Sequence, residues 1–325
     1  MKTSAYFITL LGLVACLLGL SEASAQNYPA RPIRVIQPLG PGSPGDLASR
    51  AIAQSLSQTL SQPVIVENRV GANGILGMEA CVNALPDGYT LCAPSGSQIS
   101  INPFVYAKLS YDPPRDLVPV ILVGNIKSSI VVNPSLPVKS MAELIDLAKA
   151  KPGALNWGSW GVGSLTHLYL AWVENKFGVS ITHVPHKTLG AATMAAVAGQ
   201  VQVMQTTPGL ALPLAKAGKL RVLAVTGDKR SDFMPDVPSF KELGYDLQFE
   251  SWIGVFVPKD TPNEIVRLLN TEIGKLIADS KFSQRFLRPA AVVAAGGSTE
   301  EFAAFLKRDR ETAATLIKMA KLRPE

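Results

Sequence analysis

IRVIQPLGPGSPGDL, residues 33–47, reads as a short strand, a Gly- and Pro-rich loop and the start of a helix near Leu47. The apolar, β-branched run 33–36 bounded by turn residues is typical of a buried strand. Similar short runs recur along the chain and alternate with longer stretches of helical periodicity. They lie at residues 64–66, 90–92, 130–132, 220–225 and 253–257. Repeated alternation of strand and helix predicts an α/β fold with mainly parallel sheets.

The composition fits a globular protein. The 325 residues are 47% hydrophobic and 17% charged, which allows one large domain or two medium ones. The formal charge is +6, but the basic residues are scattered instead of forming runs. We therefore expect a generally basic soluble protein that does not bind nucleic acid.

The N-terminus predicts export. Lys2 precedes an uncharged apolar run at residues 5–20, and Ala23-Ser24-Ala25 follows as a small-residue cleavage site. The run is shorter than the roughly 20 residues that a membrane-spanning helix needs. We expect a signal peptide at residues 1–25, cleaved after Ala25, and a periplasmic mature protein. A lipoprotein box ending at Cys16 is the alternative.

Two cysteines, Cys81 and Cys92, stay in the mature chain, in a compartment where disulfides form. One lies in a predicted helix and the other in the next predicted strand. Either a disulfide or two buried thiols is compatible with this spacing.

The loop at residues 38–46 has a spacing that superficially matches a dinucleotide-binding fingerprint, with glycines at 40, 42 and 45 and Glu67 further on. Pro41 and Pro44 lack the N–H groups that would face a pyrophosphate, and an exported protein rarely meets a nicotinamide cofactor. We therefore expect no cofactor.

The same geometry suits a smaller anion, because glycines allow close approach of the backbone and the following helix N-terminus attracts negative charge. Ser43 adds a hydroxyl, and Asp46 is expected to be the N-cap. The predicted ligand-binding residues of this first loop are Leu39, Gly40, Gly42, Ser43, Gly45 and Asp46.

A second loop, at residues 156–167, repeats this logic on a separate α/β segment. It is rich in Gly and Ser and opens another helix. The Gly-x-Ser-x-Gly motif of a hydrolase is not present in it, so no catalytic residue is predicted. Trp157 and Trp160 fit either a pocket wall or the core. The predicted ligand-binding residues are Ser159, Trp160, Gly163, Ser164 and His167.

All three histidines, His167, His183 and His186, fall within 20 residues, which raises the alternative of a metal site. Zinc needs three or four converging ligands. His183 and His186 are separated by a proline at a strand end, so separate packing or hydrogen-bonding roles are favoured and no metal is predicted. Two anion-binding loops on separate segments instead suggest a cleft between two lobes, which a ligand would close.

The whole mature chain resembles the tripartite tricarboxylate transporter substrate-binding family, also called the Bug family of periplasmic receptors. The resemblance rests on an ordered series of motifs, each weak alone. They are Tyr28-Pro29-x-Arg31-Pro32-Ile33-Arg34, the loop 38–46, Val66-Glu67-Asn68-Arg69 with Gly71, Pro86-Asp87-Gly88-Tyr89-Thr90, Ile101-Asn102-Pro103, Asn133-Pro134-Ser135, Gly161-x-Gly163-Ser164 with His167-Leu168, Val184-Pro185-x-Lys187 and Ala217-Gly218-Lys219-Leu220-Arg221.

The resemblance implies a two-lobed type 2 periplasmic-binding fold with two crossovers and no enzymatic activity. Lobe 1 would comprise residues 26–124 and 251–325, and lobe 2 residues 125–250. It also implies a monomer that binds a small carboxylate between the two loops and delivers it to membrane permease subunits. Ser95 and Ser97 resemble the family's first-lobe polar wall.

Two departures bear on the ligand. His186 and Thr188 stand where the family commonly has Tyr and Gly, and His186 is taken as a ligand-binding residue. Thr206 stands where many members, amino-acid binders included, carry an Asp. With no carboxylate there to pair an ammonium group, we predict a ligand without an amino group. The rival hypotheses are a receptor for a sensor kinase and an exported dehydrogenase or hydrolase.

Overall fold

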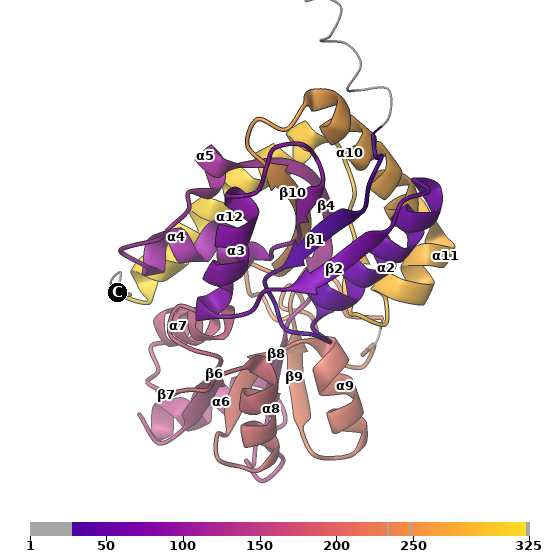
Figure 1. Cartoon of the computed structure of the whole chain (residues 1–325). Helices are drawn as coiled ribbons and strands as arrows, with labels where there is room; N and C mark the ends of the chain where they lie inside the picture. Colours follow the sequence, from indigo (N-terminus) through magenta and orange to yellow (C-terminus); the bar gives the residue numbers. More distant parts are fainter. Residues whose placement is uncertain (1–27, 233, 248, 323–325) are drawn as a thin grey trace, which may run out of the picture.

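The computed structural model describes residues 28–322 except 233 and 248, and it contains two β-sheets, which lie one above the other in Figure 1. The strands of the first sheet are β1 (Ile33–Gln37), β2 (Val64–Asn68), β3 (Thr90–Cys92), β4 (Leu117–Ile126), β10 (Ser251–Pro258) and β11 (Val292–Ala294). Those of the second are β5 (Ser129–Val132), β6 (Asn156–Ser159), β7 (Thr182–Pro185), β8 (Val203–Thr206) and β9 (Arg221–Val225). Each sheet with its helices forms one lobe.

Helices surround both sheets. Those that follow first-lobe strands are α2 (Pro44–Thr59), η1 (Ala72–Gly74), α3 (Ile75–Val82), η2 (Ser97–Ile101), α4 (Asn102–Val105), α5 (Pro113–Asp116), α10 (Asn263–Ala278), α11 (Ser280–Phe282), η3 (Ser283–Leu287) and α12 (Thr299–Met319). Those of the second lobe are α6 (Met141–Ala150), α7 (Leu165–Phe177), α8 (Leu189–Val197) and α9 (Pro208–Lys216). Each described helix is too short or too polar to cross a lipid bilayer. The predicted signal peptide, its cleavage after Ala25 and the alternative at Cys16 lie outside the described residues.

The strand order is β11-β4-β10-β3-β1-β2 in the first sheet and β7-β6-β8-β5-β9 in the second. β1, which precedes the first predicted loop, is parallel to β2 and β3. Residues 156–159, predicted as the start of the second loop, instead form β6, which is parallel to β7 and β8. Antiparallel strands are also present: β10 pairs with β4, and β5 pairs with β9. The chain passes from the first sheet to the second through β4 and β5 and returns through β9 and β10. The two strands of each pair therefore run in opposite directions.

Apolar periodicity decides which faces are buried. In β1, Ile33 and Val35 are buried while Arg34 between them is exposed. In α10 a stripe at helical spacing is buried against the first sheet, consisting of Val266, Leu269, Ile273 and Ile277. Burying such a stripe is what holds a helix of this length against a sheet.

The C-terminal helix α12 packs on both lobes. Phe302 near its start belongs to a core cluster with Trp252 and Phe256 of the first sheet. Leu316 and Ile317 near its end belong to the main cluster of the second lobe. This helix therefore connects the two cores across the boundary between the lobes.

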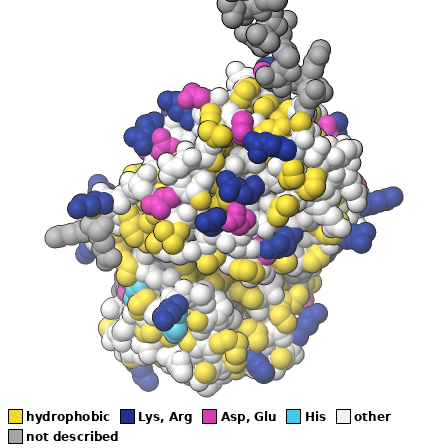
Figure 2. Space-filling model, viewed as in Figure 1, with side chains coloured by type: hydrophobic (Ala, Val, Ile, Leu, Met, Phe, Trp, Pro, Cys, Tyr) yellow, Lys and Arg dark blue, Asp and Glu magenta, His cyan; other side chains and the backbone are white. Residues whose placement is uncertain are grey.

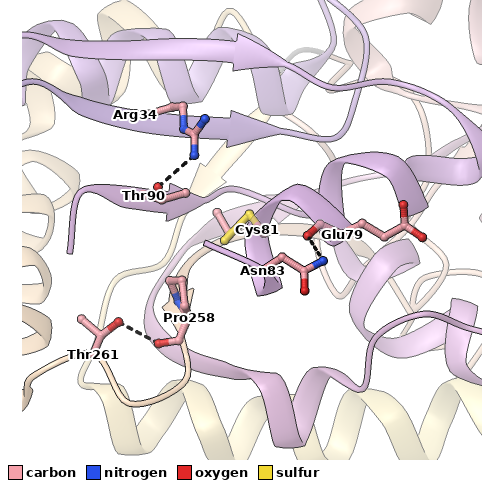
Figure 3. Close-up of a disulfide and its surroundings, with 8 residues drawn as sticks. Arg34, Glu79, Cys81, Asn83, Thr90, Pro258 and Thr261 are labelled. Atoms are coloured by element: carbon pink, nitrogen blue, oxygen red, sulfur yellow. Dashed lines mark hydrogen bonds between the residues drawn. A yellow bond between two sulfur atoms is a disulfide. The ribbon is translucent and has the colours of Figure 1, made fainter. Parts of the chain in front are cut away.

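Cys81 of α3 and Cys92 of β3 form a disulfide, with their Cα atoms 5.8 Å apart (Figure 3). The sequence left the choice between a disulfide and free thiols open. The structure favours the disulfide because α3 packs directly on the first sheet, which brings the two Cα atoms to the usual separation for a bridge.

Candidate binding site

The first loop runs from β1 to α2 and is held by its own hydrogen bonds. Ser43 is the N-cap of α2, and its hydroxyl accepts from the Asp46 N–H at 3.2 Å. The Asp46 carboxylate accepts from the Gly42 N–H at 2.9 Å. The prediction that Asp46 is the N-cap is therefore wrong. Pro44, with its fixed φ, is the first helical residue, so α2 begins three residues earlier than expected.

Asp46 is buried and fully engaged. Its carboxylate accepts from Arg50 Nε at 3.1 Å and from Asn68 Nδ2 at 2.8 Å. Burial raises the pKa of Asp46, but the hydrogen bonds from Arg50, Gly42 and Asn68 outweigh it and hold the pKa below its usual value. An ionised carboxylate with these partners fixes the loop and leaves little capacity for a ligand.

The remaining residues of the first loop differ in how open they are. The Leu39 N–H donates to Gln37 Oε1 at 3.1 Å, and Gly45 packs against the same Gln37 side chain. Gly40 and Gly42 have open space where a side chain would project, and Gly42 has φ +77°. The backbone at these two glycines is the part of the loop that a small ligand can approach.

The second loop begins at the end of β6. Ser159 Oγ lies 2.6 Å from His183 Nε2 and accepts from the Gly161 N–H at 3.1 Å. Ser164 Oγ donates to the Gly161 carbonyl at 2.6 Å and lies 3.0 Å from Thr166 Oγ1. Both serines are almost completely buried. Their hydroxyls shape the turn rather than pointing into open space.

The N-terminus of α7 follows this turn. Ser164 is the N-cap, but its hydroxyl is directed to Gly161 and Thr166 instead of capping the first turn. The first N–H groups of a helix have no carbonyl partner within the helix, so a ligand can accept from them. Trp160, half-buried, packs against the second-lobe core.

Gly163 brings the second loop against the first lobe. It has φ +72°, and a Cβ placed on it would lie 3.0 to 3.1 Å from side-chain carbons of Val105. Val105 ends α4, which lies between β3 and β4 in the chain. The second loop thus lies at the boundary between the lobes, where Figure 1 shows α7 next to the first lobe.

Two histidines support the second loop. The His167 and His183 rings stack at 3.9 Å between centroids, and the Gly163 N–H donates to His167 Nδ1 at 3.1 Å. A neutral His167 therefore carries its proton on Nε2. Burial, reinforced by His183, lowers the pKa of His167 to about 4, and burial also lowers the pKa of His183. Histidine side chains reach the surface of the second lobe in Figure 2.

The sequence did not identify the role of His183. A packing or hydrogen-bonding role was expected for this residue, but no partner was predicted and it was not placed among the ligand-binding residues. The parallel register of β6 and β7 pairs Trp157 with His183, which places the imidazole beside the end of β6. His186 also lies here, since its N–H donates to the Ser159 carbonyl at 2.8 Å. Within the described part of the chain, no group of three or more His, Cys, Asp or Glu could hold a metal ion.

Lowering the pH from 7 to 4 is expected to weaken the fold through this pair. Because the pKa of His167 is lower in the folded than in the unfolded chain, the stability that depends on neutral imidazoles is complete above pH 6.5. It is lost as the pH falls from there to about 4. The loss should be roughly 1–2 kcal/mol for both partly exposed rings. Urea unfolding at several pH values across this range gives the free energy of unfolding as a function of pH. This free energy should fall less steeply with falling pH in a His167→Gln/His183→Gln variant than in the wild type. Equal slopes would contradict the assignment.

The other predicted residues lie in separate surroundings. Ser95 Oγ donates to Gln98 Oε1 at 2.9 Å, and Ser97, half-buried, begins η2. Thr206 is fully buried at the end of β8, with its hydroxyl 3.4 Å from that of Thr193 on α8. One network of contacts thus joins five of the predicted residues, namely Ser159, Gly163, Ser164, His167 and His186. The first loop, the Ser95 loop and Thr206 are each held by other partners.

Comparison with known proteins places this chain in a family. Residues 48–322 match the model of the tripartite tricarboxylate transporter family receptor. The chain is 33% identical over 302 residues to Protein BugT of Bordetella pertussis, which covers 91% of this chain and 93% of BugT.

Solved structures show the same fold. R. palustris Rpa4515 with adipate superposes with a TM-score of 0.85 and 30% identity over 92% of this chain and 100% of that one. MatC from Rhodopseudomonas palustris with bound malate has a TM-score of 0.78 and 26% identity over 89% and 100% of the two chains. The predicted two-lobed α/β fold is confirmed. The chain belongs to the tripartite tricarboxylate transporter receptor family, whose members are substrate-binding receptors of the periplasm.

Proposed function

We propose that this protein binds a small organic carboxylate without an amino group between its two lobes and delivers it to the membrane subunits of a tripartite tricarboxylate-type transporter. The observation that carries the proposal is the N-terminus of α7, whose cap residue Ser164 is engaged elsewhere while Gly163 touches the other lobe. The first N–H groups of a helix have no carbonyl partner within it, and together with the positive end of the helix dipole they favour an anion. Relatives with adipate and malate bound support the ligand class.

The two helix N-termini are not equivalent in this proposal. At α2 the carboxylate of Asp46 and the hydroxyl of Ser43 already accept from backbone N–H groups. A negative ligand near Asp46 would be repelled. The ligand carboxylate is therefore assigned to the start of α7, and the open backbone at Gly40 and Gly42 closes over it from the other lobe.

Residues 26–124 with 251–325 form lobe 1 in this proposal, and residues 125–250 form lobe 2. The strand assignments support it, because the first sheet takes its strands from residues 33–126 and 251–294 and the second from residues 129–225. We also propose export with cleavage after Ala25 and a monomeric mature protein. Lys and Arg are spread among acidic and apolar residues on the face in Figure 2, which agrees with a small-molecule partner.

Ligand selectivity is proposed from the end of β8. Gln205, Thr206 and Thr207 are all uncharged, and a bound ammonium group would find no carboxylate in this segment to pair with. An unpaired buried ammonium is strongly unfavourable. We therefore expect di- and tricarboxylates or aromatic acids to bind more tightly than aspartate or glutamate.

A thermal-shift screen of the mature protein tests the proposal. Malate, adipate, citrate and benzoate are compared with aspartate and glutamate. A ligand at 100 times its dissociation constant should add about 2.7 kcal/mol of stability. Stabilisation by the two amino acids alone would refute the selectivity, and stabilisation by none of the acids would refute carboxylate binding.

A charge variant locates the site. Val162 is exposed in the second loop, so Val162→Asp places a negative charge beside the start of α7 without disturbing the core. Val162→Asp should abolish the thermal stabilisation by the carboxylate ligand, whereas the uncharged Val162→Asn should keep it. Equal shifts in both variants would remove the α7 N-terminus from the site.

A further inference from the structure

A pocket of about 480 Å³ lies on the first lobe, and none of the residues that line it belongs to the two loops. Figure 1 shows the elements around it, α4, α5 and α12, on one side of the lobe. Its apolar lining includes Phe104, Leu117, Phe256 and Leu306. The volume is within the roughly 300–1,000 Å³ of small-molecule pockets.

The polar part of the pocket comes from α12. Lys307, Arg310 and Glu311 are the charged residues that line it, so cations outnumber anions there. The Nε atom of Arg310 is buried without a hydrogen-bond partner among the described residues. Buried polar groups in proteins are generally paired, and a guanidinium whose Nε lacks a partner favours a ligand that binds the group. A carboxylate suits this role because guanidinium can bind it through two parallel hydrogen bonds.

We propose that this pocket is a second binding site, for an amphipathic carboxylate with one alkyl chain or aromatic ring. The apolar part would pack against Phe104, Leu117 and Phe256, and the carboxylate would accept from Arg310. The residues that line the pocket are distinct from those of the two loops. The size of the pocket favours a small molecule over a protein segment.

Octanoate is a suitable probe for the mature full-length protein, with octan-1-ol and octylamine as matched compounds of the same chain length. Isothermal titration should show octanoate binding at least about tenfold more tightly than either, because only the carboxylate can pair with Arg310. Octanol or octylamine binding as tightly as octanoate would overturn the proposed role of Arg310.

Three variants locate the probe. Arg310→Gln removes the charge, and Ala303→Trp fills the pocket from an exposed lining position. Both should weaken octanoate binding about tenfold or more. Arg308→Gln, an exposed position on the same helix outside the lining, should leave binding unchanged.

The proposal fails if octanoate binds equally to all three variants. It also fails if Val162→Asp, and not Arg310→Gln, abolishes octanoate binding, since the probe would then occupy the site between the lobes. This second outcome would leave the proposed carboxylate site at α7 standing, so failure of the two proposals can be told apart.

Discussion

Replacing Gly163 by valine is expected to abolish the stabilisation of the protein by its carboxylate ligand. Gly163 has φ +72°, and a Cβ there would already be 3.0 Å from Val105 Cγ1. The valine methyl groups would extend further and hold the second loop away from α4. Since the ligand is proposed to bind between the lobes, a separation here removes contacts that exist only in the closed form.

Two further variants separate this contact from backbone strain. A side chain at positive φ costs on the order of 1–3 kcal/mol wherever it occurs. Gly178 has φ +64° with open space beside it, so Gly178→Val adds the strain alone and should keep ligand binding. Adding Val105→Ala to Gly163→Val should restore part of the binding measured by calorimetry. A double variant that binds no better than Gly163→Val would show that the Val105 contact is not the cause.

Trp157→Ala is expected to have the largest effect on stability. The Trp157 side chain is fully buried in the second-lobe core, and its Nε1–H donates to the Thr166 carbonyl at 3.0 Å. Truncation leaves a large cavity and removes the hydrogen bond to the Thr166 carbonyl in the first turn of α7. Such a change costs about 3–5 kcal/mol. Urea unfolding of the mature protein should show the loss directly.

Trp157→Phe is the matched control. It keeps most of the apolar bulk and removes the donor, so it should cost about 1–3 kcal/mol. If the urea midpoint of unfolding of Trp157→Ala were close to that of the wild type, the core around β6 would tolerate the cavity. Such a midpoint would also show that this side chain does not hold α7 in place.

Local patterns in the sequence predicted the elements that carry the site. A short apolar run followed by a Gly-rich loop predicted β1 and the helix after it, because strand and helix periodicity depend on neighbouring residues. The Gly- and Ser-rich stretch 156–167 predicted the helix α7, but its first four residues, expected in the loop, form the strand β6. The boundary of α2 was misplaced, since Asp46 resembles an N-cap and the first-turn proline was not used. Both residues lie in the same turn, so the sequence contained the signal for the correct boundary.

Contacts between distant residues were decided by the tertiary structure. Position in the sequence gave no sign that His183 would lie 2.6 Å from Ser159, or that Val105 would touch Gly163. The choice between a disulfide and free thiols at Cys81 also depended on how α3 packs on the first sheet.

The sequence by itself determined the α/β class, the two loops and, through its motifs, the family. These features are written in residues that are close along the chain. The tertiary structure alone decided that the hydroxyls of Ser159 and Ser164 form hydrogen bonds with Gly161 within the turn, that the Ser164 side chain does not cap α7, and that α12 joins both cores. The physical reason is that hydrogen bonds and packing between segments depend on strand register and helix placement, which no local pattern specifies.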